Sequence, residues 1–142
     1  MTRLSPTQAQ LLAAAPVGHL ATAAASGAPH VIPVCFASDG QSIYSVLDQK
    51  PKRTSLTRLR RVRNILENPQ VALVVDHYEA DWNRLWYLLI TGRGELLLEG
   101  EERGDAVRLL RQKYVQYREM EIDANPVIKI TPQRIVSWGG AG

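Results

Sequence analysis

The sequence predicts a mainly β domain, an antiparallel barrel of about six strands decorated by about three helices. Two observations predict this class: three short strand patterns joined by turn signals precede the first long helix, and strands and helices do not alternate as a doubly wound parallel sheet requires. The 142 residues are 45% hydrophobic and 22% charged, a composition typical of one globular domain and unlike that of a disordered chain. With no repeat or linker, we expect one domain over residues 1–142.

The N-terminal segment carries the signals of a helix start. Ser5 is a candidate N-cap, Pro6 occupies the first helical position, and Gln8 completes a capping box. These signals predict a helix that runs to about Ala14 and is ended by Pro16. We therefore expect this alanine-rich segment to belong to the fold and not to be a signal peptide.

Three strands are predicted next, at residues 18–24, 29–37 and 42–47. Pro33 lies inside the second strand and indicates an edge position or a bulge, because proline cannot donate to a β-ladder. Asp39-Gly40 is a strong hairpin signal between the second and third strands.

A helix follows, because apolar side chains recur at helical spacing at Leu56, Leu59, Val62, Ile65 and Leu66. Thr54 or Ser55 can cap its start, and Asn68-Pro69 stops it. The same spacing leaves its arginines, including Arg60 and Arg61, largely off the apolar face.

The rest of the chain predicts strands at residues 71–75, 85–98 and 127–138, and a helix at about 102–119. That helix carries Val107, Leu110, Tyr114 and Tyr117 on one stripe. Glycines 92 and 94 interrupt the strand at 85–98 and predict a bend or bulge, as barrels need at corners.

Charge is concentrated in one segment. The formal net charge is only +3, but residues 50–63 contain seven cations and no acid: Lys50, Lys52, Arg53, Arg58, Arg60, Arg61 and Arg63. This segment joins a strand to a helix start, where free N–H groups and the helix dipole favour a phosphate, and the hydroxyl of Thr54 or Ser55 adds a donor. A solvated basic helix face is the alternative. A nucleic-acid surface is less favoured, because no aromatic residues are interleaved with the cations.

A second polar cluster, residues 76–87, contains acids beside His77. Its spacing matches no standard metal-ligand set, so we expect no metal. Trp82 and Trp86 can stack on a planar heterocycle, or pack in the core or in a dimer interface. Tyr44, His77 and Tyr78 are the candidate proton donors.

The chain has no nucleophile elbow, Walker loop or dinucleotide fingerprint, which favours chemistry supplied by a bound cofactor. No apolar run approaches the roughly 20 residues of a membrane span. The single cysteine, Cys35, excludes an intrachain disulfide, so nothing requires an oxidising compartment. We expect a cytoplasmic protein.

The ordered motifs resemble a known family over nearly the whole chain. Gly18–Thr22, Gly27–Val34, Arg63-Asn64-Ile65 and Asn68–Asp76 are similar to segments of the pyridoxamine 5′-phosphate oxidase-like split β-barrel, an FMN-binding-like fold. Within it, Asp48–Thr54, Asp76-His77-Tyr78, Asp81-Trp82 and Arg84-Leu85-Trp86 resemble the branch of oxidoreductases that use the deazaflavin coenzyme F420.

This resemblance implies a homodimer that binds its cofactor in grooves to which both chains contribute, and hydride transfer to or from a small organic substrate. It implies phosphate contacts from Lys50, Lys52, Arg53 and Arg61, and a ring that lies against Pro33, Val34, Ser45 and Val46. Seven cations exceed what one phosphate needs, which favours F420, with its phosphodiester and glutamate tail, over FMN. An FMN-dependent oxidase or reductase of the same fold and a non-enzymatic cofactor- or nucleic-acid-binding module are the alternatives.

Overall fold

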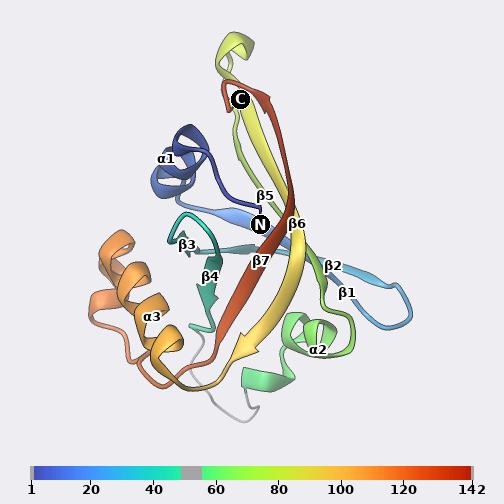
Figure 1. Ribbon diagram of the computed structural model, residues 1–142, viewed down its shortest axis with the longest axis vertical. Helices are drawn as coiled ribbons and strands as arrows, with labels where there is room; N and C mark the ends of the chain where they lie inside the picture. The colour runs from blue at the N-terminus through green and yellow to red at the C-terminus, as the bar shows by residue number, and fades with distance from the viewer. Residues whose placement is uncertain (1, 49–55, 142) are drawn as a thin grey trace.

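The computed structural model describes residues 2–48 and 56–141 (Figure 1). Within these residues the helices are α1 (Pro6–Ala14), η1 (Leu56–Arg58), α2 (Arg60–Glu67), η2 (Trp82–Arg84), α3 (Glu101–Lys113) and η3 (Val115–Arg118), where η denotes a 3₁₀-helix. The strands are β1 (Gly18–Ala23), β2 (Pro29–Val34), β3 (Ala37–Ser38), β4 (Ile43–Val46), β5 (Gln70–His77), β6 (Trp86–Leu97) and β7 (Val127–Gly139). None of the described helices is both long and apolar enough to cross a membrane.

All seven strands form one antiparallel sheet in the order β2-β1-β5-β6-β7-β4-β3, which curls into a half-barrel (Figure 1). The predicted fold class, mainly β with three helices, is confirmed. β2 lies at one edge of the sheet, as Pro33 predicts.

The seventh strand arises because the predicted strand at residues 29–37 breaks at Cys35-Phe36 and resumes as β3. At the break, the backbone N–H of Phe36 donates to the hydroxyl of Tyr114 (3.0 Å), which takes the place of a ladder partner. The Phe36 side chain is fully buried in the core. The buried Phe36 side chain and its bonded backbone N–H thus end β2 at Val34, three residues before the predicted end of the strand.

The predicted hairpin turn and the predicted bulge are both confirmed. The Asp39 carboxylate accepts from the backbone N–H groups of Gln41 and Ser42, and Gly40 has φ +92°, so the hairpin pairs β3 with β4. At the predicted bulge, the register of β6 against β7 shifts between Thr91 and Gly92. A Cβ on Gly92 would lie 2.2 Å from the carbonyl oxygen of Thr131, so only glycine fits where β6 bends against β7.

Two hydrophobic cores lie on opposite sides of β4. The main core fills the curl of the sheet under α1 and α2, and Ile43 and Leu47 of the β4 region belong to it. The second core lies under α3 and contains Tyr44, Val46 and Tyr117. This alternation along β4 explains why all four of its residues are buried.

The helix predicted to end near residue 119 ends instead at Lys113 and continues as the 3₁₀-helix η3. The Arg111 guanidinium donates to the carbonyl oxygens of Tyr117 (3.0 Å) and Met120 (2.9 Å), which draws these backbone groups out of the α-helical path. The helical stripe therefore ends in a compact turn that packs Tyr117 into the second core.

Candidate cofactor-binding site

A pocket of about 190 Å³ lies between the end of β2 and the neighbouring edge of β4. Its lining includes Pro33, Val34, Cys35, Ser45, Val46, Asp48 and Arg61. β2 is one edge of the curled sheet and β4 lies near the other, so the curl brings together strands that are far apart in the strand order. The pocket therefore brings together five residues that the sequence predicts to bind a cofactor: Pro33, Val34, Ser45, Val46 and Arg61.

The edge of β4 in this pocket is open in the described part of the chain. β3 pairs only with Ile43 and Tyr44, so on this side the ladder ends before Ser45. An open strand edge presents backbone N–H and C=O groups that can bond to the carbonyl and N–H groups of a flat heterocycle. The Ser45 hydroxyl adds a further donor and acceptor nearby.

Arg61 provides the positive charge of this pocket. Its residue exposure is only 9%, so the expectation that it lies off the apolar face of the helix is wrong. Burial lowers the pKa of the Arg61 guanidinium, and the negative charge of Asp48 acts against this change. The charge of Asp48 therefore offsets part of the cost of burying this cation. In contrast, Arg60 of the same helix is exposed.

Asp48 is itself held by Tyr117, whose hydroxyl donates to its Oδ2 atom (2.6 Å). Tyr117 is 4% exposed, and burial together with the bonded carboxylate raises the pKa of its phenol far above the ordinary value. The hydroxyl is thus a permanent donor. Sequence reasoning places Tyr117 on an apolar stripe and misses its link to the pocket, although a buried tyrosine usually signals a polar partner for its hydroxyl.

Tyr44, a candidate proton donor, lies elsewhere. Its side chain is buried in the second core, and its hydroxyl donates to Oε2 of Glu102 (2.7 Å), which also pairs with Lys129. Burial and Glu102 raise the pKa of the Tyr44 phenol well above its ordinary value. It borders a separate pocket of about 420 Å³ beside α3 and does not line the pocket that contains Arg61.

The other aromatic and histidine candidates lie around the turn that joins β5 to β6, at the top of Figure 1. Tyr78 and Trp82 are each 71% exposed, and Trp86 is half-buried against the main core. His77 pairs with Glu79, and this hydrogen bond lowers the pKa of the Glu79 carboxyl. These four residues do not line the pocket of their own chain.

The remaining predicted contacts, Lys50, Lys52, Arg53 and Thr54, lie outside the described residues. Across residues 2–48 and 56–141, no group of three or more His, Cys, Asp or Glu residues could hold a metal ion. What the described pocket offers is an open strand edge, a hydroxyl and a buried cation, a donor set suited to a flat heterocycle that carries an anionic group.

Comparison with known proteins finds a matching family model and a relative. The pyridoxamine 5′-phosphate oxidase family model matches residues 4–139. A 5a,11a-dehydrotetracycline/5a,11a-dehydrooxytetracycline reductase from Streptomyces rimosus is 30% identical over 126 residues, covering 88% of this chain and 75% of that protein.

Solved structures share the fold. The conserved hypothetical protein Rv2991 from Mycobacterium tuberculosis superposes with a TM-score of 0.76 at 18% identity, covering 96% of this chain and 85% of that one. The heme storage protein HutZ from Vibrio cholerae gives 0.69 at 15% identity, covering 97% and 95%. The family model spans nearly the whole described fold, including the strands that form the pocket, and this chain belongs to the pyridoxamine 5′-phosphate oxidase family.

Proposed function

We propose that this protein is an oxidoreductase that transfers a hydride between coenzyme F420 and a small organic substrate, with FMN as the alternative cofactor. The observation that carries the proposal is the pocket between β2 and β4, with its open edge and the buried Arg61. The 30% identical reductase supports reduction as the reaction. The motifs at residues 48–54 and 76–86, which resemble the F420-dependent branch, support the choice of cofactor.

In this proposal the chain binds and orients the cofactor, and the bound deazaflavin supplies the hydride chemistry. Pro33, Val34, Ser45 and Val46 would border the ring. Arg61 would bind an anionic group, with Lys50, Lys52, Arg53, Thr54 and Arg60 around the rest of the anionic tail. Each exposed ion pair contributes about 0.5–1 kcal/mol, so affinity would need several of them and would fall with salt.

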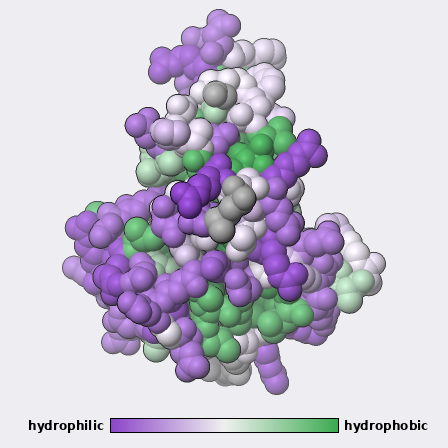
Figure 2. Space-filling view, viewed as in Figure 1, coloured by the Kyte–Doolittle hydropathy of each residue, from purple (hydrophilic) through white to green (hydrophobic). Residues whose placement is uncertain are grey.

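A second copy of the chain would complete the site. Ligand pockets usually measure roughly 300–1,000 Å³, so we expect the 190 Å³ pocket to be one part of a larger groove that both copies form. The face of the sheet opposite the main core carries the cross-strand neighbours Val74, Leu89 and Val136, all only partly buried. Figure 2 shows apolar surface beside the long strands β6 and β7, bordered by polar side chains.

We expect a homodimer through this sheet face. The turn between β5 and β6 of one copy would then approach the pocket of the other, which would bring Trp82 and Trp86 to the ring and offer His77 and Tyr78 as proton donors. Equilibrium sedimentation of the purified protein tests the dimer. A monomer at micromolar concentration would contradict it.

Titration of the cofactor-free protein with F420, FMN and hemin tests the proposed function. We expect F420 to bind at micromolar concentration, with quenching of its fluorescence and weaker binding at high salt. Binding of FMN without F420 would support the alternative cofactor. A Soret shift with hemin alone, or no binding at all, would overturn the proposal.

The cations of residues 50–63 are expected to contribute to cofactor affinity and not to stability. Lys52→Glu should weaken F420 binding about tenfold and leave the melting temperature nearly unchanged, because it would reverse one of the charges proposed to bind the anionic tail. Fluorescence titration and thermal unfolding of the same preparation measure the two effects. Equal losses of affinity and stability would indicate a structural role instead.

A further inference from the structure

The segment that follows α3 is bonded to the end of β4. The Tyr117 hydroxyl donates to Asp48 (2.6 Å), and the Asn125 side-chain amide donates to the carbonyl oxygen of Leu47 (2.7 Å). The backbone N–H of Leu47 in turn donates to the carbonyl oxygen of Pro126 (3.0 Å). Three contacts from one segment therefore fix two consecutive residues just after β4.

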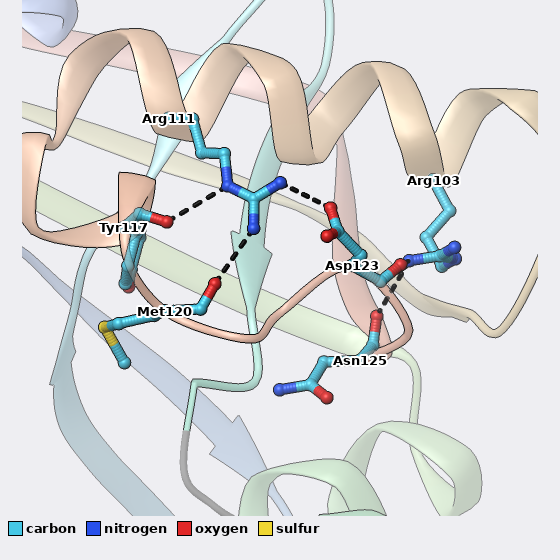
Figure 3. A network of polar contacts seen from close by, with 6 residues as sticks. All are labelled: Arg103, Arg111, Tyr117, Met120, Asp123 and Asn125. Atoms are coloured by element: carbon cyan, nitrogen blue, oxygen red, sulfur yellow. Dashed lines mark hydrogen bonds and ion pairs between the residues drawn. The ribbon is translucent and has the colours of Figure 1, made fainter.

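Two arginines of α3 hold this segment in shape (Figure 3). Arg111 and Arg103 both reach from the helix to the turn below it, where they bond mainly to backbone oxygens. The acceptors are the carbonyl oxygens of Tyr117, Met120, Asp123 and Asn125, and the carboxylate of Asp123. We call residues 114–126 with these two arginines the brace.

The brace bonds to a residue of the pocket, Asp48. Asp48 and Arg61 both line this pocket, and the negative charge of Asp48 favours the charged form of the buried Arg61. If the Asp48 carboxylate could rotate, its negative charge would not be held at one place relative to Arg61. A carboxylate that is already fixed before binding reduces the conformational entropy lost when a ligand binds.

We propose that Tyr117 is a positioning residue of the cofactor site: by holding Asp48 in place, it keeps a negative charge fixed in the same pocket as the Arg61 guanidinium, which binds the cofactor. This inference rests on the proposed function, because it concerns the same pocket. It assigns to Tyr117 no contact with substrate or cofactor.

The chain offers a matched pair of variants to test it. Tyr117 and Tyr44 are each 4% exposed, belong to the same core, and donate to a carboxylate at 2.6 Å and 2.7 Å. Tyr117→Phe and Tyr44→Phe each delete one buried hydroxyl, so we expect similar, small losses of melting temperature. We expect the Kd for F420, or for FMN if the wild type binds FMN, to rise about tenfold in Tyr117→Phe only, as loss of one charge-assisted hydrogen bond implies.

A second measurement needs no cofactor. The Nε–Hε NMR signal of Arg61, assigned by its loss in Arg61→Lys, should shift or broaden in Tyr117→Phe and stay unchanged in Tyr44→Phe. An unchanged Arg61 signal in Tyr117→Phe would overturn the inference whatever the cofactor is. An unchanged Kd, or an equal rise in both variants, would overturn it as well.

Cofactor binding by the wild type and by Tyr117→Phe separates the proposed function from the positioning role of Tyr117. If the wild type binds F420 or FMN and Tyr117→Phe binds it equally well, the proposed function stands and the positioning role is wrong. If the wild type binds neither cofactor, the proposed function is wrong, and the role of Tyr117 toward a cofactor is wrong with it.

Discussion

The two ends of the core under α3 use the same chemistry for different purposes. At one end, Tyr44 donates to Glu102, which also pairs with Lys129 at 2.7 Å, and this group lies beside the start of the helix. At the other end, Tyr117 donates to Asp48, which lines a pocket with the buried Arg61.

The difference lies in the cation. Lys129 bonds directly to Glu102, so the charges of that end compensate one another within the protein. Arg61 lines a pocket that opens to the outside, where a ligand can reach it. A buried tyrosine–carboxylate pair is therefore not by itself a sign of a functional site. A functional site also needs a nearby cation and open space beside that cation for a ligand.

The largest expected effect follows removal of the pocket cation. Arg61→Gln should raise the Kd for the cofactor about 10–100-fold, because a charge-assisted hydrogen bond in a desolvated site contributes about 1.5–3 kcal/mol. Arg108→Gln removes the same charge from the exposed side of α3 and should change the Kd less than threefold. Fluorescence titration measures both. Equal changes of the Kd in both variants would mean that only the net charge of the protein affects cofactor binding, and that the position of Arg61 in the pocket does not.

A double-mutant cycle sharpens the comparison with a smaller effect. In an Asp48→Asn background, Tyr117→Phe should no longer change the Kd, because its partner carboxylate is gone. This corresponds to a coupling of about 1–1.5 kcal/mol. Tyr44→Phe should add independently to Asp48→Asn, within about 0.5 kcal/mol. If the effects of Tyr117→Phe and Asp48→Asn on the Kd simply add, Tyr117 does not act on the pocket through Asp48.

The smallest effect concerns the Tyr44 end and depends on pH. The hydrogen bond from Lys129, with that from Tyr44, lowers the pKa of Glu102 below 4.5. Its stabilisation is therefore present above pH 4.5 and is lost as the pH falls through the lower pKa of the folded state. Glu102→Gln should reduce the free energy of unfolding by less than about 1 kcal/mol at pH 7, since the side chain is 44% exposed, and by less still at pH 3.

Urea unfolding at the two pH values measures this loss. Glu99→Gln, an exposed carboxylate just before α3, provides the control and should have no effect at either pH. A loss in Glu102→Gln that does not change with pH would show that its carboxylate charge is unimportant.

Local signals predicted the local features of the fold. The capping box at Ser5 and Gln8 starts α1, the Asp39-Gly40 turn forms the hairpin, and Gly92 marks the bulge. Each of these depends on a few neighbouring residues or on a steric limit of one residue type, so a single sequence contains the information.

Contacts between distant segments determine what the sequence could not predict. The break after β2 depends on a bond from Phe36 to Tyr114, 78 residues away. The buried Arg61 shares its pocket with Asp48, which Tyr117 holds from 69 residues away. Helical spacing alone places Arg61 toward solvent, because the spacing of apolar residues cannot indicate that Asp48 lines the same pocket. The five residues gathered at the pocket were predicted by family resemblance rather than by periodicity.

Cys35, half-buried at the border of the pocket, has a practical consequence. Because the sequence contains no other thiol, a fluorinated or fluorescent label would attach at one known position. Its signal would report occupancy of the pocket directly, so that even colourless compounds could be screened for binding.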